Sequence, residues 1–175
     1  MRNLIILSVF LSEFMITHGP ARAVTIDIDI PAQRMQVKST LGDTYVWPVS
    51  TARKGFVTPP GSYTPYSLQK MHYSRKYQMA PMPHSIFFHE GYAIHGTTSL
   101  AQLGRPASHG CVRLSPANAA KLFTLVQREG ALITIHDAAS RAKATATLAD
   151  ATAPLRKDET GEASLEQWTL RPPLD

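Results

Sequence analysis

A two-residue alternation of apolar and polar side chains constrains the fold of this chain more than any other feature. From Val24 to Ile30 every second residue is apolar, and the same alternation returns over residues 35–37. This is the period of a β-strand that buries one face. Turn signals at residues 31–33 and at residues 42–43 separate the alternating segments. Residues 24–49 are therefore predicted to form a meander of three strands.

Further strands are predicted beyond this meander, with one long loop among them. Residues 58–61 read Thr-Pro-Pro-Gly, a strong turn signal, and a strand is predicted over residues 63–68. Residues 69–83 are mixed polar, rich in Met and Pro and without a clear period, which predicts a long loop of functional character. Two short strands are predicted at residues 86–89 and 92–95.

One segment of this region has a clear helical period. Ser115 is a favourable N-cap, Pro116 suits the first helical position, and Gly130 is a stop signal before a last predicted strand at residues 131–135. The apolar face between them consists of Ala119, Leu122, Phe123 and Val126. Many strands with one late helix favour a mainly-β sandwich or barrel carrying a helix. Helices between most strands, which a doubly wound α/β fold needs, are missing.

The two ends of the chain have different compositions from the middle. Arg2, an apolar run from Leu4 to Ile16 and an Ala-Arg-Ala sequence at residues 21–23 together predict a secretory signal peptide over residues 1–23. Glu13 lies inside the run, so an uncleaved anchor stays open as an alternative, although the run is short for a membrane span. A folded domain is predicted over residues 24–137 in the periplasm or cell envelope. Residues 138–175 are expected to form a disordered or loosely docked tail.

The predicted domain is moderately basic. Residues 24–137 contain 11 Lys and Arg against 6 Asp and Glu. This balance suits an anionic partner such as a cell-wall polymer. No dense Lys/Arg stripe with interleaved aromatic residues is found, so nucleic acid is not an expected partner. A mildly basic domain with no such partner has the same composition, so charge alone does not decide the function.

Cys111 is the single cysteine of the chain, so no internal disulfide can form. It follows Gly110, which permits a sharp turn and a close substrate approach. His95, His109 and Arg113 are near in sequence, and such neighbours favour the thiolate, which is the nucleophilic form. The alternatives are an inert buried thiol, a zinc site formed by His95, His109 and Cys111, and a non-catalytic wall-binding module.

The motifs around this cysteine resemble a known family. A His-Gly-Thr sequence at residues 95–97 and Ser-His-Gly-Cys-Val-Arg-Leu at residues 108–114 are similar to the signature of the L,D-transpeptidase catalytic domain, the YkuD domain. The resemblance spans residues 24–137. It implies that Cys111 attacks the peptide bond between diaminopimelate and a terminal D-alanine, and that a second stem peptide then accepts the acyl group in a 3→3 cross-link. With water as acceptor, the same chemistry gives an L,D-carboxypeptidase or releases wall-attached protein.

The resemblance also assigns roles to individual residues. His95 is the expected general base, oriented by the backbone carbonyl of Gly96, and His109 supports the thiolate or the oxyanion. Arg113 holds the loop and is a candidate contact for a substrate carboxylate. Backbone N–H groups at Gly110 and Cys111 are the natural oxyanion donors. The remaining candidate substrate contacts are Ser108 and Gly110 in the motif and His72, Tyr77 and Met82 in the predicted loop 69–83. The expected partners are peptidoglycan stem peptides, with no cofactor or metal; the sequence leaves the oligomeric state open.

Overall fold

The computed structural model describes residues 23–143. The predicted signal peptide, apart from Ala23, and residues 144–175 of the predicted tail lie outside the described residues. Residues up to Asp137 belong to one compact unit. Residues 138–143, which are helical, begin a second unit. Within the described part of the chain, no helix combines the length and the apolar character needed to cross a membrane.

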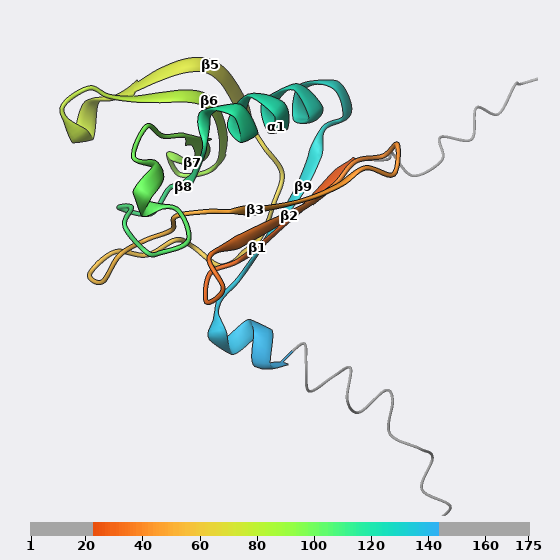
Figure 1. The fold of residues 1–175 in the computed structure, drawn as a ribbon, viewed down its shortest axis with the longest axis horizontal. Helices are drawn as coiled ribbons and strands as arrows, with labels where there is room; N and C mark the ends of the chain where they lie inside the picture. The colour runs from red at the N-terminus through yellow and green to blue at the C-terminus, as the bar shows by residue number, and fades with distance from the viewer. Residues whose placement is uncertain (1–22, 144–175) are drawn as a thin grey trace, which may run out of the picture. The chain divides into compact units, whose positions relative to one another are not determined.

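The first sheet has five strands in the order β3-β2-β1-β9-β4 (Figure 1). Its strands are β1 (Val24–Asp29), β2 (Arg34–Lys38), β3 (Thr44–Pro48), β4 (Gly61–Tyr63) and β9 (Ala131–His136). The antiparallel β1-β2-β3 meander confirms the prediction for residues 24–49. The last strand, β9, pairs in parallel with the first, so the two ends of the unit are joined in the middle of this sheet.

The second sheet has four strands in the order β5-β6-β7-β8. They are β5 (Ser67–Ser74), β6 (Ala80–His89), β7 (Tyr92–Gly96) and β8 (Val112–Leu114), and two short 3₁₀ helices, η1 (Arg75–Tyr77) and η2 (Leu100–Gln102), lie between strands. β5, β6 and β7 are antiparallel neighbours, whereas β7 and β8 are parallel. The strand predicted over residues 63–68 is wrong as a single element, because its residues divide between the two sheets around Pro65.

The long loop predicted over residues 69–83 is also wrong. These residues form most of a β-hairpin, in which Ser74 pairs with Ala80 and His72 pairs with Met82. The prolines of β6 misled the prediction because proline cannot donate a ladder hydrogen bond. Pro81 and Pro83 are tolerated because this part of β6 pairs with β5 alone, and β7 begins to pair only at Ile86.

The helix α1 (Pro116–Glu129) covers the second sheet and reaches the first. The Ser115 side chain accepts a hydrogen bond from the Asn118 N–H at its N-terminus, as the sequence predicts. Its apolar face packs against β6 and β7 and joins residues of both sheets in one core. Neighbouring core positions include Ile26, Ile94 and Ile133, all nearly or fully inaccessible to solvent. The mainly-β fold with one main helix is therefore confirmed.

This packing predicts how much α1 contributes to stability. Leu122 is 0% exposed in the core, so Leu122→Ala should lower the free energy of unfolding by about 2–5 kcal/mol through lost burial and a residual cavity. Leu100→Ala removes the same atoms from a side chain that is 54% exposed and is the matched control. Urea denaturation of both variants checks this, and equal losses would contradict the packing described here.

Candidate active site

The parallel pairing of β7 with β8 sorts the motif residues onto two faces of the second sheet. His95 is paired with Arg113, and Ile94 with Val112. Because side chains alternate along a strand, Ile94 and Val112 enter the core, and Ala93, His95 and Arg113 lie on the opposite face. Cys111, directly before β8, lies on this second face too, where its side chain packs beside Ala93. Two motifs that are separated in sequence are thus aligned by one strand pair.

The Cys111 thiol lies against a small apolar cluster formed by Met82, Phe87 and Ala93. Burial raises the pKa of the Cys111 thiol, and a hydrogen bond with the Ala93 backbone and the positive charge of Arg113 lower the pKa only in part. The thiol is therefore protonated at neutral pH in the resting protein. Arg113 favours the thiolate, as expected of this neighbour, but desolvation by burial is the larger effect on the pKa of Cys111.

His95 is 7% exposed, and its Nδ1 lies 2.8 Å from the Gly96 carbonyl oxygen. A carbonyl can only accept, so Nδ1 carries the proton and Nε2 keeps its lone pair. Burial is the main cause that lowers the pKa of His95 to about 4; the Gly96 hydrogen bond opposes it, and Arg113 and His72 add to it. The imidazole is therefore neutral and able to act as a base near pH 7.

The turn from Ser108 to Cys111 is fixed by buried hydroxyls. Ser108 Oγ donates to the Cys111 carbonyl over 2.6 Å and accepts from the Gly110 N–H over 3.0 Å. Thr58 Oγ1 donates to the Gly110 carbonyl over 2.8 Å. Ser108 is fully buried, and its hydroxyl is hydrogen-bonded within the turn, so its observed role is to hold the turn; a substrate contact by this residue stays a prediction. The Gly110 N–H is occupied as well, which removes it from the expected oxyanion donors.

Gly110 is required at this turn for two reasons. Its φ of 131° lies in the region that favours glycine. A Cβ at this position would also collide with the Tyr92 ring and would lie 2.8 Å from the Val57 carbonyl oxygen. The close approach that we expected a substrate to make at Gly110 is instead made by Tyr92 and Val57 of the protein itself.

An extended segment, residues 49–53, supports the catalytic turn from beneath. The Thr51 carbonyl accepts from the N–H groups of Ala107 and Ser108, and Ser50 exchanges both backbone hydrogen bonds with Arg113. On its other side, the buried Gln33 side chain accepts from the Thr51 N–H over 2.9 Å and donates to the Thr51 hydroxyl. Sequence patterns placed Gln33 and Thr58 in predicted turns but did not link them to the Cys111 turn, because each contacts partners distant in the chain.

His109 is held by two aromatic rings. It stacks on Tyr77 with a centroid distance of 4.4 Å and an interplanar angle of 18°, and Phe56 meets it edge-on at 4.6 Å. The pKa of His109 is lowered by desolvation and by the charges of Arg53, Arg113 and Lys76. Tyr77 is in η1 at the end of the β5–β6 hairpin, so the hairpin is attached to the catalytic turn by this stack.

The other predicted contacts lie around the same face. Arg113 is half-buried and donates from Nη1 to Gln102 Oε1 over 3.0 Å. The His72 ring meets Phe87 edge-on at 5.0 Å, and its charge acts on His95. The structure therefore brings Met82, His72 and Tyr77 from the hairpin together with the Cys111 turn. Gln102 and Phe56 were missed, since neither has a local sequence signal.

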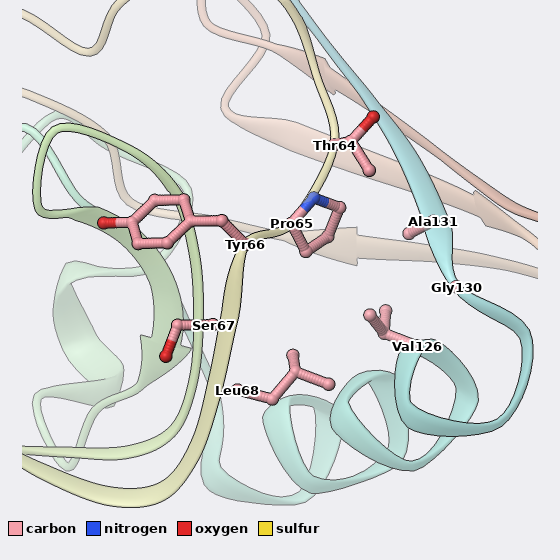
Figure 2. Close-up of a pocket in the computed structure, with 8 residues that line it drawn as sticks. All are labelled: Thr64, Pro65, Tyr66, Ser67, Leu68, Val126, Gly130 and Ala131. Atoms are coloured by element: carbon pink, nitrogen blue, oxygen red, sulfur yellow. The ribbon is translucent and has the colours of Figure 1, made fainter.

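Two other features are separate from this arrangement. Among residues 23–143, no group of three His, Cys, Asp or Glu residues is arranged to hold a metal ion. An open pocket of about 350 Å³ lies between the β4–β5 connection and the end of α1 (Figure 2). It is lined by residues 64–68, Val126, Gly130 and Ala131, and none of the motif residues takes part in it.

Comparison with known proteins gives a consistent result. A family model for the L,D-transpeptidase catalytic domain, YkuD, matches residues 23–147. The chain is similar to a solved L,D-transpeptidase from Stackebrandtia nassauensis (26% identity, TM-score 0.59, covering 73% of this chain and 62% of that one). It is also similar to an L,D-transpeptidase from Mycobacterium smegmatis, with 25% identity and a TM-score of 0.59, covering 66% of this chain and 59% of that one. L,D-transpeptidase 3 from Mycobacterium tuberculosis, solved in complex with a faropenem-derived adduct, shares the fold. It has 21% identity and a TM-score of 0.56, covering 66% of this chain and 61% of that one. The chain thus spans less than two thirds of these proteins, and no curated protein matches it.

The turn geometry predicts that Gly110→Ala disrupts the site. The added Cβ meets the Tyr92 ring and the Val57 carbonyl, so Cys111 should be displaced and its alkylation rate altered several-fold, with a loss of stability above about 1 kcal/mol. Gly104→Ala is the control. Gly104 has a φ of 84° and open space around it, so this substitution strains the backbone without adding a steric clash. Thermal denaturation and iodoacetamide labelling of both variants check this; equal behaviour would contradict the role of close packing at Gly110.

The pKa shifts predict the pH dependence of thiol reactivity. Because the pKa of Cys111 is raised above the ordinary 9.0, its alkylation rate should still be rising at pH 9.0. His95, neutral above about pH 4, should add no inflection near 6.5. The chain has one cysteine, so iodoacetamide labelling followed by mass spectrometry reports this thiol alone. A plateau reached near neutral pH would show a resting thiolate and contradict the assignment.

Proposed function

Because this chain belongs to the L,D-transpeptidase catalytic-domain family, we propose that it is a peptidoglycan L,D-transpeptidase that forms 3→3 cross-links through an acyl-enzyme on Cys111. The single observation that carries the proposal is the alignment of His95 with the Cys111–Arg113 segment on one face of the β7–β8 pair. An oriented neutral imidazole and the only thiol of the chain share that face.

The reaction proceeds in two acyl transfers that share one base. The donor carbonyl lies between diaminopimelate and the terminal D-alanine. As Cys111 Sγ bonds to its carbon, His95 Nε2 takes the thiol proton. The carbon–nitrogen bond then breaks, and D-alanine leaves with that proton on its nitrogen, which gives a thioester. The side-chain amine of a second stem peptide attacks the thioester and loses a proton to His95. The new amide forms, and the thiol is restored. General acid–base help of this kind contributes about 10²–10⁴-fold.

The neutral resting states of the Cys111 thiol and the His95 imidazole are compatible with this acyl-transfer mechanism. Proton transfer from thiol to imidazole in the transition state avoids holding a buried thiolate and a buried imidazolium in the free protein, both of which desolvation disfavours. Since Ser108 occupies the Gly110 N–H, the Cys111 N–H is the backbone donor that we assign to the developing oxyanion. His109 supports this turn through its aromatic contacts, and Arg113 both anchors the turn and offers charge to a substrate carboxylate.

Hydrolysis is the second candidate function, because water can replace the amine acceptor at the thioester without any change in the nucleophile. An L,D-carboxypeptidase, or an enzyme that releases wall-attached protein, would use the same residues. The predicted signal peptide over residues 1–23 supports action in the periplasm or cell envelope, where stem peptides are the partners.

The proposal predicts which substitutions abolish turnover. Cys111→Ala and Cys111→Ser should both lose activity, and His95→Ala should lose at least ~10²-fold in kcat because the thiol loses its base. His136→Ala is the matched histidine control, because His136 pairs with Asp27 in the other sheet and should retain activity. D-alanine release from a tetrapeptide measures all four variants. An active Cys111→Ala protein would end the proposal.

Product analysis separates the two functions. Mass spectrometry of tetrapeptide muropeptides incubated with the protein should show dimers joined 3→3, whereas tripeptides alone would favour the hydrolase. Acylation by a carbapenem should add one inhibitor mass to the wild-type protein and none to Cys111→Ala. A wild-type protein that neither releases D-alanine nor is acylated would refute both functions and leave a non-catalytic module.

A further inference from the structure

The long stretch of the domain that contains Cys111, residues 44–128, has an unbalanced charge. Residues 44–128 contain nine Lys and Arg but one acidic residue, Glu90. Among residues 23–143, Glu90 pairs with His89, Glu129 with Arg128 and Asp27 with His136. Arg53, Lys76 and Arg113 take part in none of these pairs. Their positive charges are therefore not neutralised by carboxylates of the domain.

Two of these cations contact the two aromatic rings that pack against His109. The Arg53 guanidinium carbon is 4.8 Å from the centroid of the Phe56 ring, and Lys76 Nζ is 5.7 Å from that of Tyr77. Phe56 and Tyr77 are the rings that contact His109, edge-on and stacked respectively. Cation–π contacts of this kind orient the charged groups without neutralising them. Arg53 and Lys76 are therefore held near His109, which is two residues before Cys111 in the sequence.

The electrostatics agree with this geometry. Arg53, Arg113 and Lys76 all act on His109, and Arg113 acts on Cys111 as well. Arg53 and Lys76 are exposed, whereas Arg113 is half-buried. An exposed cation can meet an anionic ligand from solvent at little desolvation cost, and neighbouring uncompensated charges raise the local concentration of anions. This arrangement fits a ligand that carries several carboxylates.

On the basis of the proposed function, we propose that Arg53 and Lys76 form a cationic rim beside Cys111 that binds free carboxylates of the stem peptide. The rim makes the enzyme selective for stem peptides whose carboxyl groups are free over those in which they are amidated. An Arg guanidinium can bind a carboxylate through two parallel hydrogen bonds, and a Lys ammonium adds a point charge. A carboxamide of nearly the same shape carries no net charge and gains neither interaction.

A matched pair of synthetic tetrapeptides tests the rim. The two peptides end in D-alanine and differ only in whether the side carboxyls of the glutamate and diaminopimelate residues are free or amidated. D-alanine release by the wild-type protein should give a kcat/KM at least about 10-fold higher for the free acid, mainly through KM. The preference should shrink when the salt concentration is raised from about 0.05 M to about 0.5 M, because screening weakens exposed charges.

Substitutions then test which residues cause the preference for the free-acid peptide. Arg53→Gln and Lys76→Gln should each lower it at least about 3-fold, while iodoacetamide, which is neutral, labels Cys111 at an unchanged rate. Lys121→Gln makes the same change in net charge on α1, where Lys121 Nζ lies 4.1 Å from the Tyr45 ring centroid, and should keep the full preference. Equal kcat/KM for the two peptides, or a preference unaffected in both rim variants, overturns the rim. Failure of the wild-type protein to process either peptide instead refutes the proposed function on which the rim rests.

Discussion

Hydrogen bonds between Thr51 and the turn that leads to Cys111 are the constraint on which the rest of the candidate site depends. The turn before Cys111 has little regular structure of its own, and segment 49–53, which is buried at residues 49–51, supplies its backbone with hydrogen-bond partners. Gln33 holds the same segment from the β1–β2 connection, so the turn is tied to the first sheet as well as the second. Fully satisfied buried polar networks of this kind specify one arrangement, because any other arrangement leaves buried groups unpaired.

Desolvation decides the chemical state of the two reactive groups. The same partial burial that positions Cys111 and His95 disfavours charge on both, so the resting pair is thiol and imidazole. In the mechanism that we propose, charge develops only as the substrate bond forms, where hydrogen-bond donors and nearby cations are already in place. The neutral pair and the cationic surroundings are compatible in this proposal, because burial keeps the free protein uncharged at the thiol while the proposed rim binds carboxylates of the substrate.

Local sequence patterns were sufficient to predict those elements whose structure depends on their own residues alone. The alternation from Val24, the N-cap at Ser115 and the glycine at the end of α1 each predicted an element that the structure confirms. The β5–β6 hairpin was misjudged because its strand pairing compensates for prolines, and pairing is a property of two segments together. For the same reason the sequence did not reveal that β9 pairs with β1, or that Phe56 and Tyr77 meet on His109.

The sequence by itself determined the mainly-β class, the main helix of the domain, the family of the catalytic domain and the identity of the one available thiol, because these depend on local periodicity and on a contiguous motif. Only the tertiary structure decided the state and surroundings of that thiol. Whether a buried group is charged, and whether Ser108 faces a substrate or its own turn, depends on which distant segments remove water and supply hydrogen bonds. Those contacts exist only once the two sheets and the helix have packed together.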